Sequence, residues 1–102
     1  MGFLVGKNEE TREYKIDADK IFDAILETLP EIGFKPKIAS KLYGQIEATQ
    51  LSFGIGRQKL EIDVSEANGK TSVYVKETNL MWILLVHNVF PFFQTLEKKL
   101  KE

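Results

Sequence analysis

The sequence contains no cysteine, a single histidine and almost no net charge. The lack of cysteine excludes disulfides, thiolate metal sites and cysteine nucleophiles, and one histidine cannot supply two imidazole ligands within one subunit. With 14 Lys plus Arg against 15 Asp plus Glu, the formal net charge is −1. The chain therefore lacks the broad positive field that a non-specific nucleic-acid binder needs, while a metal site built only from carboxylates stays open.

Long apolar runs and targeting signals are also missing. No stretch reaches the roughly 18 to 20 apolar residues that span a bilayer. Residues 1–6 have no basic region and are too short for the apolar core of a signal peptide, so we expect a cytoplasmic protein. The 102 residues, 43% of them hydrophobic, suffice for one globular α+β domain, 1–102, and are too apolar for a disordered chain.

Alternation of apolar and polar residues, the two-residue period of a half-buried strand, occurs in five segments. These segments predict strands at 11–16, 34–39, 42–50, 57–66 and 70–78. Between the last two strands, Asn68-Gly69 suits a type I′ hairpin turn, because both residues tolerate positive φ. The last two strands should therefore lie side by side and antiparallel.

Three- and four-residue spacing of apolar side chains predicts two helices. The first follows Asp17, whose carboxylate we expect to cap it, and ends or kinks at Pro30. The second runs over 89–101 behind the N-cap Asn88, with Pro91 in its first turn, where a missing N–H costs little. Together the segments predict an α+β fold: a five-stranded antiparallel sheet with two helices on one face.

Glycine and core positions also resemble those of a known group of domains. They are Gly33-Phe34, then Gly44-Gln45-Ile46-Glu47-Ala48, then Ser52-Phe53-Gly54, followed by an alternating strand. With the strand-helix-four-strand-helix order, this pattern resembles one repeat of the TATA-binding-protein-like (TBP-like) fold and a family of uncharacterised small prokaryotic domains. The resemblance covers roughly residues 10 to 100. It implies this fold and no activity, cofactor or catalytic residue.

Seven consecutive apolar residues, 80–86, precede the second helix and cannot all face one core. Part of the run can lie under the first helix while residues 3–5 cover the rest. Alternatively, the run can form an interface with a second copy or a protein partner, or, with Trp82 and nearby lysines, insert shallowly into a membrane surface. We expect a non-catalytic protein-binding or self-assembly module that forms a homodimer or larger assembly. The expected interface residues are Leu80, Met81, Trp82, Ile83, Leu84, Leu85, Phe90 and Phe92.

A rival interpretation comes from the aromatic residues. Phe22, Phe53, Trp82 and Phe93 could line a pocket for a small apolar ligand between the helices and the sheet. A cavity of several hundred cubic ångströms there would favour this interpretation, and a filled core would argue against it.

Residues that carry chemistry are few, and each has a simple structural explanation. His87 has no nucleophile or carboxylate at a useful spacing, so we expect no enzyme. Gly54 and Gly56 are followed by a strand, whereas a phosphate-binding glycine loop is followed by a helix. The outer face of the predicted sheet carries four cations and four carboxylates, namely Lys15, Arg57, Lys59, Lys76, Glu13, Glu47, Glu61 and Asp63. This mixture suits cross-strand ion pairs better than a metal or nucleic-acid site.

Tyr43 and Tyr74 on the same outer face could stack nucleic-acid bases. Exposed aromatic residues on a strand more often pack across strands. With the charges balanced, the outer face argues against a nucleic-acid partner.

Overall fold

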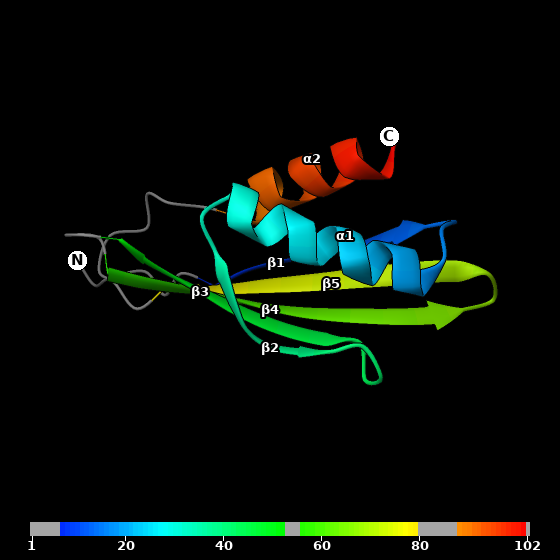
Figure 1. Ribbon diagram of the computed structural model, residues 1–102, viewed down its shortest axis with the longest axis horizontal. Helices are drawn as coiled ribbons and strands as arrows, with labels where there is room; N and C mark the ends of the chain where they lie inside the picture. The colour runs from blue at the N-terminus through cyan, green and yellow to red at the C-terminus, as the bar shows by residue number, and fades with distance from the viewer. Residues whose placement is uncertain (1–6, 53–55, 80–87, 102) are drawn as a thin grey trace.

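We describe a computed structural model of the chain, covering residues 7–52, 56–79 and 88–101. It has the expected α+β fold, with a five-stranded antiparallel sheet and two helices on one face (Figure 1). The elements are β1 (Lys7–Tyr14), α1 (Ala18–Glu31), β2 (Lys35–Ser40), β3 (Gln45–Ser52), β4 (Gly56–Ala67), β5 (Lys70–Asn79) and α2 (Val89–Leu100).

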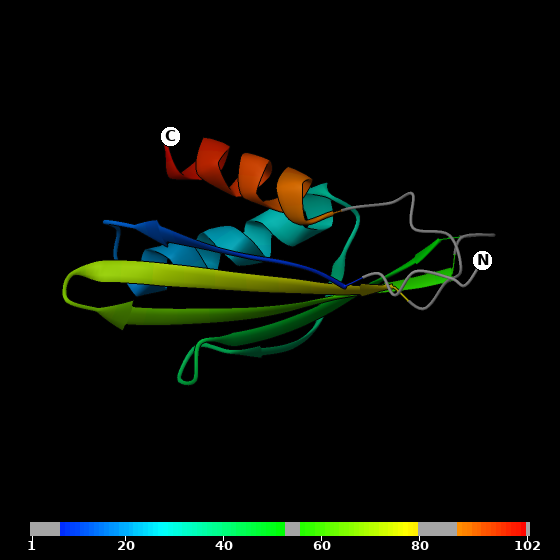
Figure 2. The same cartoon turned by 180° about the vertical axis from the view of Figure 1, so that it is seen from behind.

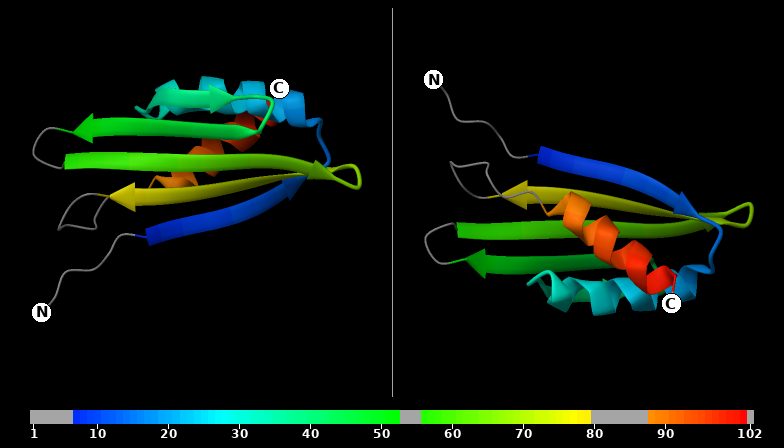
Figure 3. Two further views of the ribbon diagram at one scale, coloured as in Figure 1. Left: turned by 90° about the horizontal axis from the view of Figure 1, so that it is seen from below. Right: turned by 90° about the horizontal axis from the view of Figure 1, so that it is seen from above.

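The strands lie in the order β1-β5-β4-β3-β2, so the first strand pairs with the last and the rest follow as a meander. Seen from below, the sheet lies open to the viewer, and seen from above both helices cover it (Figure 3). The two sheet faces therefore have different surroundings: one packs on the helices and the other faces solvent.

The core lies between the helices and the sheet, as the spacing of apolar residues predicts. Every second residue of the central strands points into it, and the apolar stripes of both helices complete it. The fully or nearly fully buried side chains include Ile21, Ile25, Leu29, Ile46, Ala48, Leu60, Ile62, Val73, Val75, Phe93 and Leu96.

The two-residue turn between β4 and β5 has the expected geometry. Ala67 pairs with Lys70, and the two residues between them have positive φ, +56° at Asn68 and +76° at Gly69. Both signs match a type I′ turn, whose twist agrees with that of the flanking strands.

The segment before β3 differs from the sequence-based expectation. The strand begins at Gln45 rather than Leu42, because 41–44 form a turn in which Gly44 has a φ of +66°. Leu42 is 86% exposed and does not alternate into the core with Ile46. Gly44 also lies against β4: its carbonyl accepts the N–H of Val64 at 2.7 Å, and a β-carbon there would overlap the Val64 carbonyl oxygen.

Both helix caps differ in detail from the prediction. Asp17 and Asn88 occupy the N-cap positions, but neither side chain accepts a capping hydrogen bond. Pro30 lies inside the last turn of α1, which ends one residue later. The helix still stops near Pro30, because Gly33 then takes a φ of +88° and leads into β2.

Candidate functional site

The structure describes only two residues of the expected interface. Residues 80–87, which include Trp82, the other apolar residues of that run and His87, lie outside the described residues. Of the two remaining members, Phe90 is 62% exposed at the start of α2, whereas Phe92 is fully buried. The expectation is therefore wrong for Phe92, which packs edge-to-face on Phe93 with ring centroids 5.3 Å apart.

The start of α2 is attached to the sheet by a buried carboxylate. Glu77, on the helix-facing side of β5, has no exposed surface. One of its oxygens accepts the backbone N–H of Asn88 at 2.8 Å, and the other accepts the side-chain amide of Asn88 at 2.5 Å. Glu77 thus binds the N-cap residue itself, as the acidic residue of a capping box does, and places a carboxylate where the helix dipole favours negative charge.

Glu77 is absent from the residues expected from the sequence to carry a site, yet the sequence contains a signal for it. Val73 and Val75 point into the core, and the same alternation places Glu77 on the inner face. A charged residue at an inward position is rare unless it has a partner. On β4, Gln58 continues the inner row of Leu60 and is 1% exposed.

A second cluster joins β1 to α2. Arg12 donates to Glu97 at 2.7 Å and also to Glu10, and the hydroxyl of Tyr14 donates to Glu97 at 2.8 Å. The guanidinium also lies 4.6 Å from the ring centroid of Phe93, within range of a cation–π contact. Hydrogen bonding to Arg12 lowers the pKa of Glu97, and burial raises the pKa of Tyr14.

Next to this cluster lies a cavity of about 340 Å³ between β1 and the end of α2. It is lined by Tyr14, Ile16, Glu97, Leu100 and Lys101. Three of these side chains offer apolar surface and two carry charge, so the cavity could accept a small apolar molecule with one polar group.

The described residues do not show the ligand pocket expected from four aromatic residues. Phe22 and Phe93 are 4% and 0% exposed members of one packed core cluster, while Phe53 and Trp82 lie outside the described residues. Phe22 lines a shallow cavity of about 190 Å³ beside the 41–44 turn, where Lys41 pairs with Asp23 at 2.8 Å. Phe93 is not among the described residues that line this cavity.

The open face of the sheet carries most of the charges that we expected there. Lys59 pairs with Glu47 at 3.6 Å, as the ion-pair interpretation predicts. Glu47 lies opposite Glu61 and Glu61 opposite Lys76, and a cavity of about 220 Å³ is lined in part by Glu47, Glu61 and Asp63. Among the described residues, no three acidic or histidine side chains are grouped so that they could hold a metal ion.

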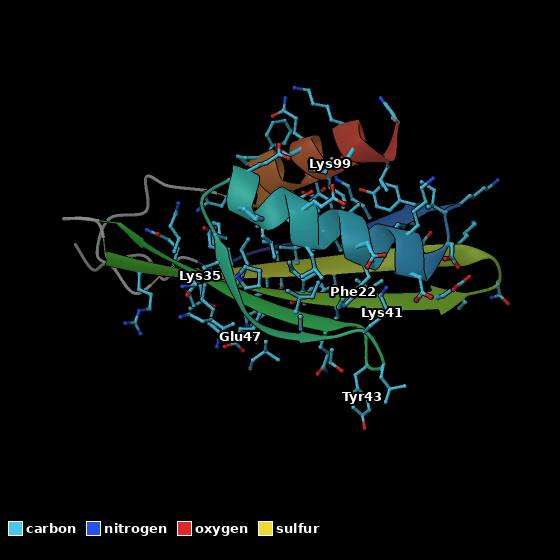
Figure 4. The ribbon with its side chains drawn as sticks, viewed as in Figure 1. Phe22, Lys35, Lys41, Tyr43, Glu47 and Lys99 are labelled. Carbon is cyan, nitrogen blue, oxygen red and sulfur yellow. The ribbon has the colours of Figure 1, made fainter. Side chains whose placement is uncertain are left out.

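Three other residues expected on this face, a lysine and two tyrosines, lie in different parts of the fold. Lys15 follows the end of β1. Tyr43, 74% exposed, projects from the turn before β3 (Figure 4). Tyr74 points outward from β5 and donates to Glu9, which raises its pKa to about 12. The two tyrosines therefore belong to separate elements, the 41–44 turn and β5.

The glycines of the weak phosphate-loop pattern have no helix behind them. Gly56 opens the strand β4, and Gly54 lies outside the described residues. Within the described ranges, no helix is long and apolar enough to cross a membrane.

No protein-family model and no curated protein matches this sequence. Among solved structures, the chain is similar to one described as the crystal structure of Ara h 8.0201, with a TM-score of 0.63 and 15% sequence identity over 96% of this chain and 99% of that one. The TBP-like relationship stays a prediction, although the predicted element order is confirmed. At this identity the similarity defines the fold alone: two helices packed on one face of an antiparallel sheet.

Proposed function

We propose that the protein is a non-catalytic binding module that associates with a second copy of itself through the start of α2 and the apolar residues 80–86. The observation that carries the proposal is Phe90. It is 62% exposed, while Val89 directly before it and Phe92 two residues after it are buried. The large aromatic ring therefore points away from the core, close in the chain to seven consecutive apolar residues.

Energy and geometry support this choice. Leaving a Phe side chain in water forfeits about 1.5 to 3 kcal/mol relative to full burial. The turn that carries Phe90 is held by the two hydrogen bonds from Asn88 to Glu77, so little conformational entropy is lost when a partner binds. A two-fold contact buries the same surface on both copies and closes, which prevents open-ended assembly.

Sedimentation velocity over a concentration series tests the proposal. The unmodified protein should dimerise in the micromolar range. Phe90→Lys alone, and Trp82→Lys with Leu84→Lys together, should each give a folded monomer. Tyr43→Lys is the matched control, since Tyr43 is similarly exposed and lies on a different turn. An unmodified protein that stays monomeric at several hundred micromolar without detergent or lipid would refute self-association.

Binding of a small apolar ligand is the second candidate, and the cavity of about 340 Å³ between β1 and α2 favours it. The fold shared with the Ara h 8.0201 structure is compatible with a pocket between helix and sheet. An environment-sensitive dye such as anilinonaphthalene sulfonate should bind there with a saturable fluorescence increase. Replacing Leu100 with Asp should weaken that binding at least fivefold, and an unchanged titration would exclude the cavity.

A further inference from the structure

A third region, separate from those above, lies where β2 begins and β3 continues past it. The first pair between these strands is Lys35 with Thr49, while β3 runs on to Ser52. In this notch lies a cavity of about 390 Å³, lined by Lys37, Thr49, Gln50 and Arg57. Figure 4 shows Lys35 at the same end of the sheet, which is the end opposite the Asn68-Gly69 hairpin.

The cations of this notch have no acidic partner among the described residues. Neither Lys37 nor Arg57 makes an ion pair within those ranges, whereas Lys41 and Lys59 do. Among the residues outside those ranges, only Glu102 is acidic. Glu47 is already paired with Lys59, which leaves the notch with uncompensated positive charge.

Three of the four lining side chains can donate hydrogen bonds to a ligand here. Arg57 and Lys37 offer charged N–H groups and Thr49 a hydroxyl, whereas the Gln50 amide donates to the carbonyl of Ile32 at 3.5 Å. No carboxylate is among them. A donor set of this kind, with an arginine able to bind two oxygens at once, matches a tetrahedral oxyanion and repels cations.

The volume indicates the size of the ligand. About 390 Å³ falls within the range of small-molecule pockets and far exceeds the volume of a single oxyanion. The lining therefore leaves space beside the anion for an organic part.

We propose that the notch lined by Lys37, Thr49, Gln50 and Arg57 binds the phosphate group of a small phosphorylated molecule. This site is independent of the proposed self-association, because it shares no residue with the start of α2. The phosphate can come from a soluble phosphomonoester or from the headgroup of an anionic lipid, and the experiment separates the two sources.

The test uses the full chain labelled with ¹⁵N, titrated at constant ionic strength with inorganic phosphate and with glycerol 3-phosphate. Saturable shifts should be confined to the amides around Lys37, Thr49, Gln50 and Arg57, and glycerol 3-phosphate should bind more tightly than phosphate. Arg57→Gln and Lys37→Gln should each weaken binding at least fivefold. Lys70→Gln is the control, because it removes one exposed cation at the opposite hairpin, and it should change affinity less than twofold.

Co-sedimentation with phosphatidylcholine vesicles, with and without phosphatidic acid, identifies the source. Vesicle binding that needs phosphatidic acid and is lost in Arg57→Gln assigns the site to a lipid headgroup, and its absence alongside glycerol 3-phosphate binding assigns it to a soluble ligand. The proposal is overturned if neither probe binds saturably, or if Lys70→Gln weakens binding as much as Arg57→Gln.

Discussion

The buried carboxylate of Glu77 gives the sharpest prediction about stability. Its two oxygens accept the backbone N–H and the side-chain amide of Asn88 at 2.8 and 2.5 Å, and the residue has no exposed surface. In Glu77→Leu both donors lose their acceptor in a buried site. Each unsatisfied group costs about 1 to 3 kcal/mol, and losing the carboxylate at the helix N-terminus adds about 0.3 to 1 kcal/mol.

We therefore expect Glu77→Leu to lower the free energy of unfolding by about 2 to 7 kcal/mol. Glu77→Gln keeps one oxygen and the shape of the side chain, and the Asn88 amide can turn over to accept from the new NH₂ group. This milder variant should lose about 1 to 2 kcal/mol, because the charge-assisted hydrogen bonds become neutral ones.

Urea unfolding followed by circular dichroism measures these differences. Combining Glu77→Gln with Asn88→Ala completes a double-mutant cycle, which should give a coupling energy of about 0.5 to 3 kcal/mol. The control is Glu61→Gln, the same chemical change on the solvent-facing side of β4, which should shift stability by less than about 0.5 kcal/mol.

Hydrogen exchange tests the location of the effect. In Glu77→Gln the Asn88 amide should exchange at least tenfold faster than in the unmodified protein, because its local opening costs less. An unfolding midpoint of Glu77→Gln equal to that of Glu61→Gln, with unchanged exchange at Asn88, would refute the role of Glu77 as the anchor of α2.

Two further predictions concern the turns and the response to pH. Gly44→Ala should lower the free energy of unfolding by more than about 3 kcal/mol, because the new β-carbon meets the Val64 carbonyl. Gly69→Ala has nothing within 4 Å of its β-carbon, so it should lower that free energy only by the roughly 1 to 2 kcal/mol of left-handed backbone strain. Equal urea midpoints of the two variants would contradict this ranking. Because the pKa of Glu97 is lowered in the folded state, its stabilisation should be present above its unfolded-state pKa near 4.5 and disappear as the pH falls through the folded-state value. Glu97→Gln should remove that part of the acid dependence, and identical pH profiles of both proteins would show that the Arg12 contact adds nothing.

Most of the fold could be predicted because local pattern and tertiary packing agree. Alternation in β4 and β5, the Asn68-Gly69 turn and the apolar stripes of both helices each specify one arrangement, and the structure has it. The prediction failed where a tertiary contact decides. Leu42 continues the alternation of β3 in the sequence, but the contact of Gly44 with Val64 requires a turn there.

The candidate sites were predicted less well, because they depend on pairs of residues far apart in the chain. Glu77 and Asn88 are eleven residues apart, and Arg12 and Glu97 eighty-five. No local spacing relates such partners. Phe92 was assigned to an interface because apolar residues at the start of a helix look alike in sequence, and only the packing against Phe93 separates it from Phe90.

The sequence and pairing of β2 also affect how readily copies of this chain can aggregate through the sheet edge. An open sheet presents two edge strands, β1 and β2 (Figure 2), and an unprotected edge can recruit another strand and begin a fibril. Along β2, Pro36 has no N–H to offer, the pairing shifts between Pro36 and Ile38, and Lys35 and Lys37 place charge on either side. An incoming strand would meet a missing donor, an irregular backbone and two ammonium groups, so this edge resists growth of an intermolecular sheet even though Ile38 is 55% exposed.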